Sequence, residues 1–271
     1  MTLSNLPPGG GRPDDARAMN SMTPPSAPGR RGLLALGLAG LATAAAPAAP
    51  ASAAAVPALL PSPARRSGGP AGPSGPLGPL GPLGPLAGLA ELRAGNARYT
   101  ALRQRHPHED AAWRASIAAA QHPFAVVLGC VDSRVPPELV FDQGLGDLLT
   151  VRSAGQALDE AVLGSLQFGV DELGVRLIVV LGHERCGAAA AAVEHVRTGK
   201  PVAGHLARVV EELTPAARSA RGLPGDWVEN TVRAQVDRVR RRLTRDAAFS
   251  RALVVGARFD LDTGEVAFRP S

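Results

Sequence analysis

The chain of 271 residues carries 29 basic and 24 acidic side chains, a formal net charge of +5. Residues 1–86 hold six arginines and two aspartates, which gives +4, so the remaining 23 basic and 22 acidic groups give residues 87–271 only +1. A domain balanced in this way lacks the basic surface of a nucleic-acid-binding protein, and we expect no nucleic-acid partner.

The first 86 residues do not have the composition of a folded domain. They contain 17 of the 25 prolines and no Trp, Tyr, Phe or Cys, so they cannot bury a core. Arg30-Arg31, a following apolar run and small residues near 51–53 are typical of a twin-arginine export signal. The run is shorter than the roughly 20 residues of a spanning helix, so no stable membrane anchor is expected. We predict an exported protein with a signal over 1–53 and a Pro/Gly/Ala-rich disordered linker over 54–86; the alternative is a cytoplasmic protein with a disordered leader.

Residues 87–271 predict one α/β domain. Short, β-branched apolar runs indicate strands, and apolar residues at helical spacing indicate helices. Alternating strands and helices favour a mostly parallel central β-sheet flanked by helices. The expected elements, in chain order, are helices around 89–102 and 110–120, a strand at 123–129, a helix starting at Pro136-Pro137, a strand at 148–151, a helix over 158–173, a strand at 176–182, helices around 206–213 and 228–239, and strands at 252–259 and 265–268.

Two short polar segments follow the first and third predicted strands. They are Cys130-Val-Asp-Ser-Arg134 and His183-Glu-Arg-Cys186, and they contain the only two cysteines of the chain. Open α/β sheets bind their ligands at the carboxyl ends of parallel strands. Two thiolates, one imidazole and the Asp132 carboxylate form a set of four ligands that suits zinc.

The spacing within these segments predicts their geometry. Cys130 and Asp132 are two residues apart and point the same way in an extended strand end. His183 and Cys186 are three apart and share a face of a first helical turn. Arg134 is placed to pair with Asp132 bidentately and hold it off the metal, which leaves one position open, as in catalytic zinc sites. A disulfide between the cysteines is the alternative, but it explains neither the histidine nor the carboxylate.

The segments Cys130-Val-Asp-Ser-Arg-Val-Pro-Pro-Glu138 and Gly182-His-Glu-Arg-Cys-Gly187 resemble those of the β-class carbonic anhydrase family, over about residues 87–269. The resemblance implies reversible hydration of carbon dioxide to bicarbonate and a proton, with one zinc ion per chain. In this interpretation a zinc-bound hydroxide is the nucleophile, and Asp132, held by Arg134, orients it. In a closed state Asp132 instead becomes the fourth metal ligand beside Cys130, His183 and Cys186.

The resemblance also implies a homo-oligomer, a dimer or a tetramer, with N-terminal helices that extend onto a dimer partner. Gln143 and Gly187 are the candidate substrate-binding residues. Some members stabilise the closed state with a bicarbonate pocket made of tryptophan, arginine and tyrosine. Val127, Arg152 and Phe259 occupy the matching positions here, so only the arginine remains and we expect no such switch.

Two other functions remain as alternatives. A hydrolase of carbon disulfide or carbonyl sulfide on the same scaffold would use identical metal ligands. A non-catalytic zinc-binding module would have a closed site, against which Arg134 beside Asp132 argues. Ser153, Gln156 and Glu184 differ from the residues usual in the family, and none of these differences removes a metal ligand.

Overall fold

The computed structural model describes residues 83–269 of the chain. The predicted export signal over 1–53 and residues 54–82 of the predicted linker lie outside the described residues. Within 83–269, no helix combines the length and the hydrophobicity needed to cross a bilayer.

A five-stranded sheet forms the centre of this domain, in the order β2-β1-β3-β4-β5. The first four strands in this order are parallel, and β5 pairs antiparallel with β4. This confirms the predicted α/β class with a mostly parallel sheet. The elements are α1 (Pro85–Thr100), α2 (Ala111–Ser116), β1 (Ala125–Gly129), α3 (Pro137–Val140), β2 (Leu148–Arg152), the 3-10 helix η1 (Ala154–Gln156), α4 (Glu160–Asp171), β3 (Leu177–His183), α5 (Gly187–Thr198), α6 (Leu206–Ser219), α7 (Trp227–Arg245), the 3-10 helix η2 (Ala247–Phe249), β4 (Leu253–Phe259) and β5 (Val266–Arg269).

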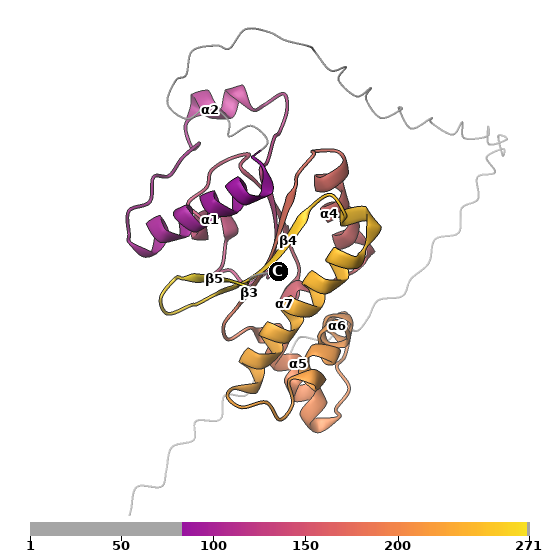
Figure 1. Ribbon diagram of the computed structural model, residues 1–271. Coiled ribbons are helices and arrows are strands. Elements are labelled where there is room, and N and C mark those ends of the chain that lie inside the picture. Colours follow the sequence, from indigo (N-terminus) through magenta and orange to yellow (C-terminus); the bar gives the residue numbers. More distant parts are fainter. Residues whose placement is uncertain (1–82, 270–271) are drawn as a thin grey trace, which may run out of the picture. The chain divides into compact units, whose positions relative to one another are not determined.

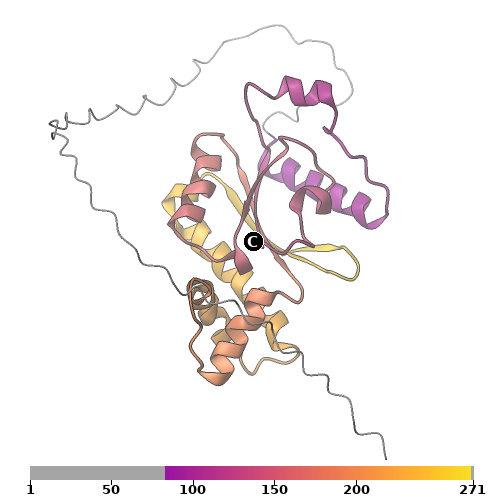
Figure 2. The ribbon, with the colours of Figure 1, turned by 180° about the vertical axis from the view of Figure 1, so that it is seen from behind.

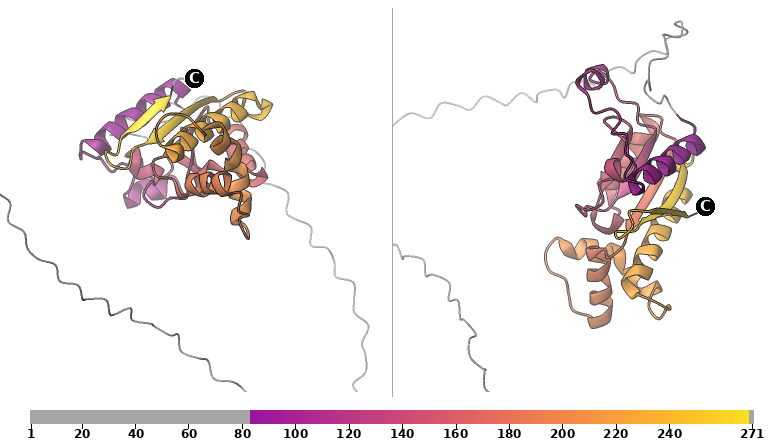
Figure 3. Two further views of the ribbon diagram at one scale, coloured as in Figure 1. Left: turned by 90° about the horizontal axis from the view of Figure 1, so that it is seen from below. Right: turned by 90° about the vertical axis from the view of Figure 1, so that its left-hand side faces the viewer.

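Helices cover both faces of the sheet, and β1 and β3 are therefore buried along their whole length. Alternate side chains of these strands point to opposite faces. Val127 and Val179 pack with Leu89 and Leu92 of α1, whereas their strand neighbours pack with residues of α4 and α7. The arrangement can be followed in Figures 1 and 3.

A third apolar cluster joins α5, α6 and α7 at the carboxyl end of β3. It contains both cysteines together with Ala189, Leu213 and Val232. Figure 2 shows this helical group at one end of the sheet. The two thiols are therefore placed where strands and helices meet.

The first two predicted helices needed correction. The helix predicted over 110–120 is only the six-residue α2, and none of its residues is buried. An exposed segment without an apolar face to bury gains little from extending such a short helix. Leu102, predicted as part of the first helix's apolar stripe, follows the end of α1, has a φ of 55° and is 84% exposed.

Candidate metal centre

Three predicted metal ligands meet at the carboxyl ends of the adjacent strands β1 and β3. Cys130 directly follows β1, His183 is the last residue of β3, and Cys186 precedes the first residue of α5. All three side chains are buried, and their ligand atoms lie within 4.8 Å of one another. Both cysteines are free thiols, so the alternative of a disulfide is not what the structure shows.

The route from His183 to Cys186 differs from the predicted helical turn. β3 continues through His183, and the chain then makes a tight turn in which Arg185 has a left-handed φ of 49°. The helix begins only at Gly187, with Cys186 as its N-cap residue. Pairing with β4 keeps the backbone extended up to His183, so the turn at Glu184 and Arg185 is what brings Cys186 back beside the histidine.

The imidazole of His183 has its two nitrogens in different surroundings. Nδ1 lies 2.8 Å from the carbonyl oxygen of Glu184. A carbonyl only accepts, so Nδ1 carries the proton and Nε2 presents its lone pair. Nε2 is buried without a hydrogen-bond partner. A buried lone pair beside two sulfur atoms is a site that a zinc ion fits.

Hydrogen bonding shifts the pKa values of the two cysteine thiols in opposite directions. A hydrogen bond from Cys186 lowers the pKa of the Cys130 thiol to about 4, although burial opposes this. The shared contact raises the pKa of Cys186. The backbone N–H of Gly155 also donates to the Cys130 sulfur at 3.3 Å. The lowered pKa favours the thiolate form of Cys130, which is the form that binds a metal.

Asp132 and Arg134 form the predicted bidentate pair. Arg134 donates from Nε to Oδ1 at 2.9 Å and from Nη2 to Oδ2 at 2.7 Å. Its backbone N–H also donates to Oδ1 at 3.0 Å. These contacts hold the pKa of Asp132 well below its usual range. Oδ2 lies 3.9 Å from Nε2 of His183, so the carboxylate is next to the ligand group but is bound to the arginine.

Asp132 does not extend the strand as predicted. β1 ends at Gly129, and the Asp132 carbonyl accepts a hydrogen bond from Val135 at 3.1 Å. The carboxylate is aimed by this turn, because the Arg134 N–H that binds it belongs to the same turn.

The two predicted substrate-binding residues lie in different places. Gly187 is the first residue of α5, beside Cys186. Gln143 is buried, and its amide donates to the carbonyl of Phe141 at 2.9 Å and to Glu91 of α1 at 3.4 Å. The chain turns after α3, where Asp142 has a φ of 47°, so this amide joins the turn to α1. A contact between Gln143 and substrate stays a prediction.

A cavity of about 620 Å³ is lined by Arg134 of the pair, whereas Asp132 and the three candidate metal ligands are not among its lining residues. Its wall includes Tyr99, Phe259 and Leu261, which are largely apolar, together with Arg134 and Arg185. A small uncharged molecule and a small anion can both be accommodated by such a lining.

The sequence did not reveal two backbone contacts of the centre, the Gly155 N–H on Cys130 and the Glu184 carbonyl on His183. Both come from main-chain atoms, which carry no residue-type signal. The only related signal in the sequence is that position 155 is a glycine, the residue that most easily adopts the left-handed φ of 61° found there.

The fold is an open α/β sheet, and two cysteines and a histidine meet at the ends of two neighbouring parallel strands. This combination is that of a known enzyme family. The family model for carbonic anhydrase matches residues 125–266, from β1 into β5. The chain belongs to the β-carbonic anhydrase family.

Among individual relatives, the chain is 40% identical over 185 residues to carbonic anhydrase 2 of Mycobacterium tuberculosis, covering 66% of this chain and 89% of that protein. It is 41% identical over 186 residues to a carbonic anhydrase of Mycolicibacterium smegmatis, covering 66% and 90%.

Solved structures share the fold. The chain matches one of two tetrameric β-carbonic anhydrases from Sordaria macrospora with a TM-score of 0.53 and 22% identity, over 68% of this chain and 96% of that one. It matches a Coccomyxa β-carbonic anhydrase in complex with acetazolamide with a TM-score of 0.53 and 24% identity, over 67% and 85%.

Proposed function

We propose that the protein binds one zinc ion per chain and catalyses the reversible hydration of carbon dioxide to bicarbonate and a proton. The observation that carries this proposal is the buried, unpartnered Nε2 of His183 beside two free cysteines and an arginine-held carboxylate. The relatives named carbonic anhydrase support the same activity.

Cys130, His183 and Cys186 would hold the zinc ion. Thiolates and a neutral imidazole are donors that zinc prefers, and three protein ligands are the number found in catalytic sites. When bound, zinc lowers the pKa of water and so supplies a hydroxide nucleophile near neutral pH.

Asp132 orients the nucleophile in this proposal. Its carboxylate is ionised because Arg134 stabilises the charge, so it accepts a hydrogen bond and does not donate one. Arg134 fixes both carboxylate oxygens, which limits the directions from which a further hydrogen bond is accepted. If Arg134 released it, Asp132 would be available as a fourth metal ligand.

The cavity beside the pair would receive the substrate. The side chains of Tyr99, Phe259 and Leu261 offer an apolar wall to uncharged carbon dioxide, and Arg134, Arg185 and Asp262 are charged groups of the same wall.

We further propose that the protein is a homo-oligomer, a dimer or a tetramer, whose N-terminal helices extend onto a partner. Leu102, Val131 and Leu139 are apolar and at least half exposed on the described domain, which is typical of surface that a partner covers. The similar protein from Sordaria macrospora is described as tetrameric.

Stopped-flow measurement of carbon dioxide hydration on protein of known zinc content tests the proposal. We expect a rate well above that of buffer, proportional to bound zinc. Zinc-loaded protein without this rate would indicate a non-catalytic zinc module. Turnover of carbonyl sulfide or carbon disulfide in place of carbon dioxide would indicate the sister hydrolase.

A further inference from the structure

We propose that Glu184 and Arg258 are positioning residues that fix the orientation of the His183 imidazole toward the metal. The inference rests on the proposed zinc site and adds to it a partly buried ion pair. The same ion pair connects the histidine to the C-terminal hairpin formed by β4 and β5.

The main chain supplies the first link. The carbonyl oxygen of Glu184 accepts the hydrogen bond from Nδ1 of His183 at 2.8 Å. The backbone N–H of Glu184 donates to the carbonyl of Phe259, the last residue of β4, at 3.1 Å. A residue that holds the second nitrogen of a ligating histidine determines the tautomer and the plane of the ring.

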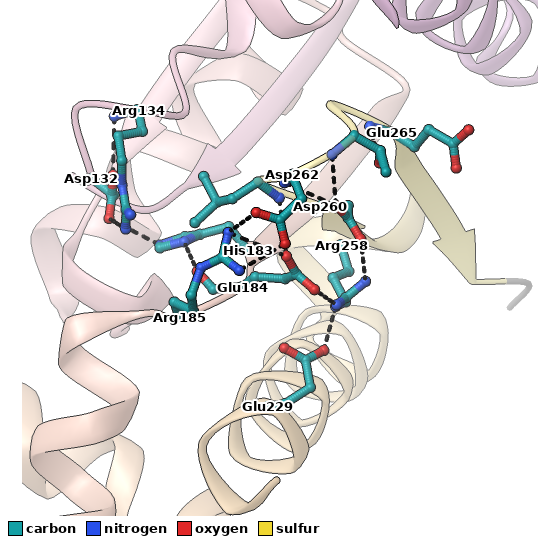
Figure 4. Close-up of polar contacts among 12 residues, drawn as sticks. Asp132, Arg134, His183, Glu184, Arg185, Glu229, Arg258, Asp260, Asp262 and Glu265 are labelled. Atoms are coloured by element: carbon teal, nitrogen blue, oxygen red, sulfur yellow. Dashed lines mark hydrogen bonds and ion pairs between the residues drawn. The ribbon is translucent and has the colours of Figure 1, made fainter. Parts of the chain in front are cut away.

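The Glu184 side chain supplies the second link. Its carboxylate accepts a hydrogen bond from Nη2 of Arg258 and another from the backbone N–H of Leu261 at 3.2 Å. The side chains of Glu184 and Arg258 are only 17% and 18% exposed. Figure 4 shows the carboxylate between the turn that holds His183 and the hairpin.

Arg258 extends the connection to a helix. It forms an ion pair with Glu229 on α7 and lies 3.9 Å from Asp260. The peptide that orients His183 is therefore held from β4, from the hairpin and from α7 at once. A partly buried pair of this kind is difficult to break because each removed partner leaves an unpaired charge.

The neighbouring pair of Arg185 and Asp262 provides a contrast. Arg185 donates two hydrogen bonds to Asp262, each at 2.8 Å. Their side chains are 54% and 72% exposed, however, and exposed pairs contribute little. Arg185 also lies 3.7 Å from Oε2 of Glu184. The hydrogen bonds that the Asp262 carboxylate accepts come from Arg185 and not from Arg258, so Asp262→Asn changes a charge on the same hairpin and leaves the Glu184–Arg258 pair in place.

The test measures zinc affinity by competition with a chromophoric chelator, and the absorption spectrum of the cobalt(II)-substituted protein. In Glu184→Ala we expect zinc affinity to fall by about 10- to 100-fold, the usual effect of removing a residue that orients a ligand. The cobalt spectrum should change, because it reports the position of the imidazole. Asp262→Asn should retain the affinity and the spectrum of the wild type.

A double-mutant cycle separates the pair from general destabilisation. Glu184→Gln and Arg258→Gln should each weaken zinc binding, and the double variant should lose less than the two effects combined. Glu184→Gln keeps an oxygen for the Leu261 N–H, so it serves if Glu184→Ala does not fold by circular dichroism.

The outcomes distinguish the two proposals. Wild-type protein that binds no zinc would overturn the proposed function. Wild-type protein that binds one zinc per chain, with the same affinity and cobalt spectrum in both Glu184 variants, would overturn only the positioning role. Equal losses in Glu184→Gln and Asp262→Asn would also overturn it, since a nonspecific charge effect would then suffice.

Discussion

Arg152 donates a hydrogen bond from Nη2 to the backbone carbonyl of Asp132 at 2.6 Å, and its Nε donates to the carbonyl of Cys130 at 2.7 Å. β2 thereby clamps the loop that carries both a metal ligand and the Asp132–Arg134 pair. The other two positions of the bicarbonate pocket described for some relatives hold Val127 and Phe259, which are buried in the core. The guanidinium of Arg152 thus donates its hydrogen bonds to main-chain carbonyls of the loop after β1.

The first prediction concerns pH. Arg134 holds the pKa of Asp132 below its usual value, so the pair's stabilisation is complete above pH 4 or so and is lost only in stronger acid. Asp132 therefore stays charged across the neutral range, and hydration should rise smoothly toward alkaline pH as the nucleophile loses its proton. Stopped-flow rates against pH check this. A steep, cooperative rise would mean that a closed state forms without the bicarbonate pocket.

The second prediction concerns the metal ligands. Cys130→Ser, His183→Ala and Cys186→Ser should each lose zinc together with activity, because a shell without one thiolate or imidazole holds zinc weakly. Elemental analysis of the purified variants measures the zinc. Full zinc content in all three variants would exclude this ligand set.

The third prediction concerns the arginine of the pair. In Arg134→Ala the Asp132 carboxylate loses both of its guanidinium contacts and is free to turn to the metal. Zinc content should be retained while hydration falls steeply, which separates this variant from the ligand variants. Unchanged activity at equal zinc content would show that the pair has no catalytic role.

The fourth prediction compares two glycines within helices. A Cβ atom at Gly95 of α1 would lie 1.7 Å from the carbonyl oxygen of Phe141, whereas one at Gly164 of α4 would meet nothing within 4 Å. Gly95→Ala should destabilise the domain by about 1–3 kcal/mol or more through overpacking. Gly164→Ala should stabilise it by about 0.5–1 kcal/mol. Urea denaturation measures both, and similar values would contradict the packing of α1 against the loop after α3.

The fifth prediction concerns location, which we propose to be outside the cytoplasm through the twin-arginine route. Replacing both Arg30 and Arg31 with lysine should block export and leave the folded enzyme inside the cell. Cell fractionation with an activity assay checks this. An identical distribution of wild type and variant would favour the cytoplasmic alternative.

The sequence predicted the parallel strands well because β1 and β3 are apolar throughout, apart from His183 at the end of β3, a pattern that few other elements share. It also predicted the meeting of Cys130, His183 and Cys186, since the ends of adjacent parallel strands share one edge. It failed on the His183–Cys186 turn, because residue spacing alone does not distinguish a helical turn from a turn that joins a strand to a helix.

Long-range polar contacts were beyond sequence reasoning. Glu184 was noticed only as a difference from the family pattern, and its partner Arg258 is 74 residues further along the chain. Gln143 was placed by resemblance, whereas its amide is engaged by α1. In each case the partner is selected by tertiary packing, which leaves no local periodicity.

The hydrogen bond between the Glu184 N–H and the Phe259 carbonyl has a consequence for biosynthesis. The ribosome releases both cysteines and the histidine well before β4, yet the turn that joins His183 to Cys186 has its hydrogen-bonding partners on β4 and in the hairpin beyond it. A nascent chain that ends before residue 261 therefore lacks part of the scaffold that orients the imidazole. The hydrogen bonds that fix the turn between His183 and Cys186 are therefore complete only after the C-terminal hairpin has been synthesised.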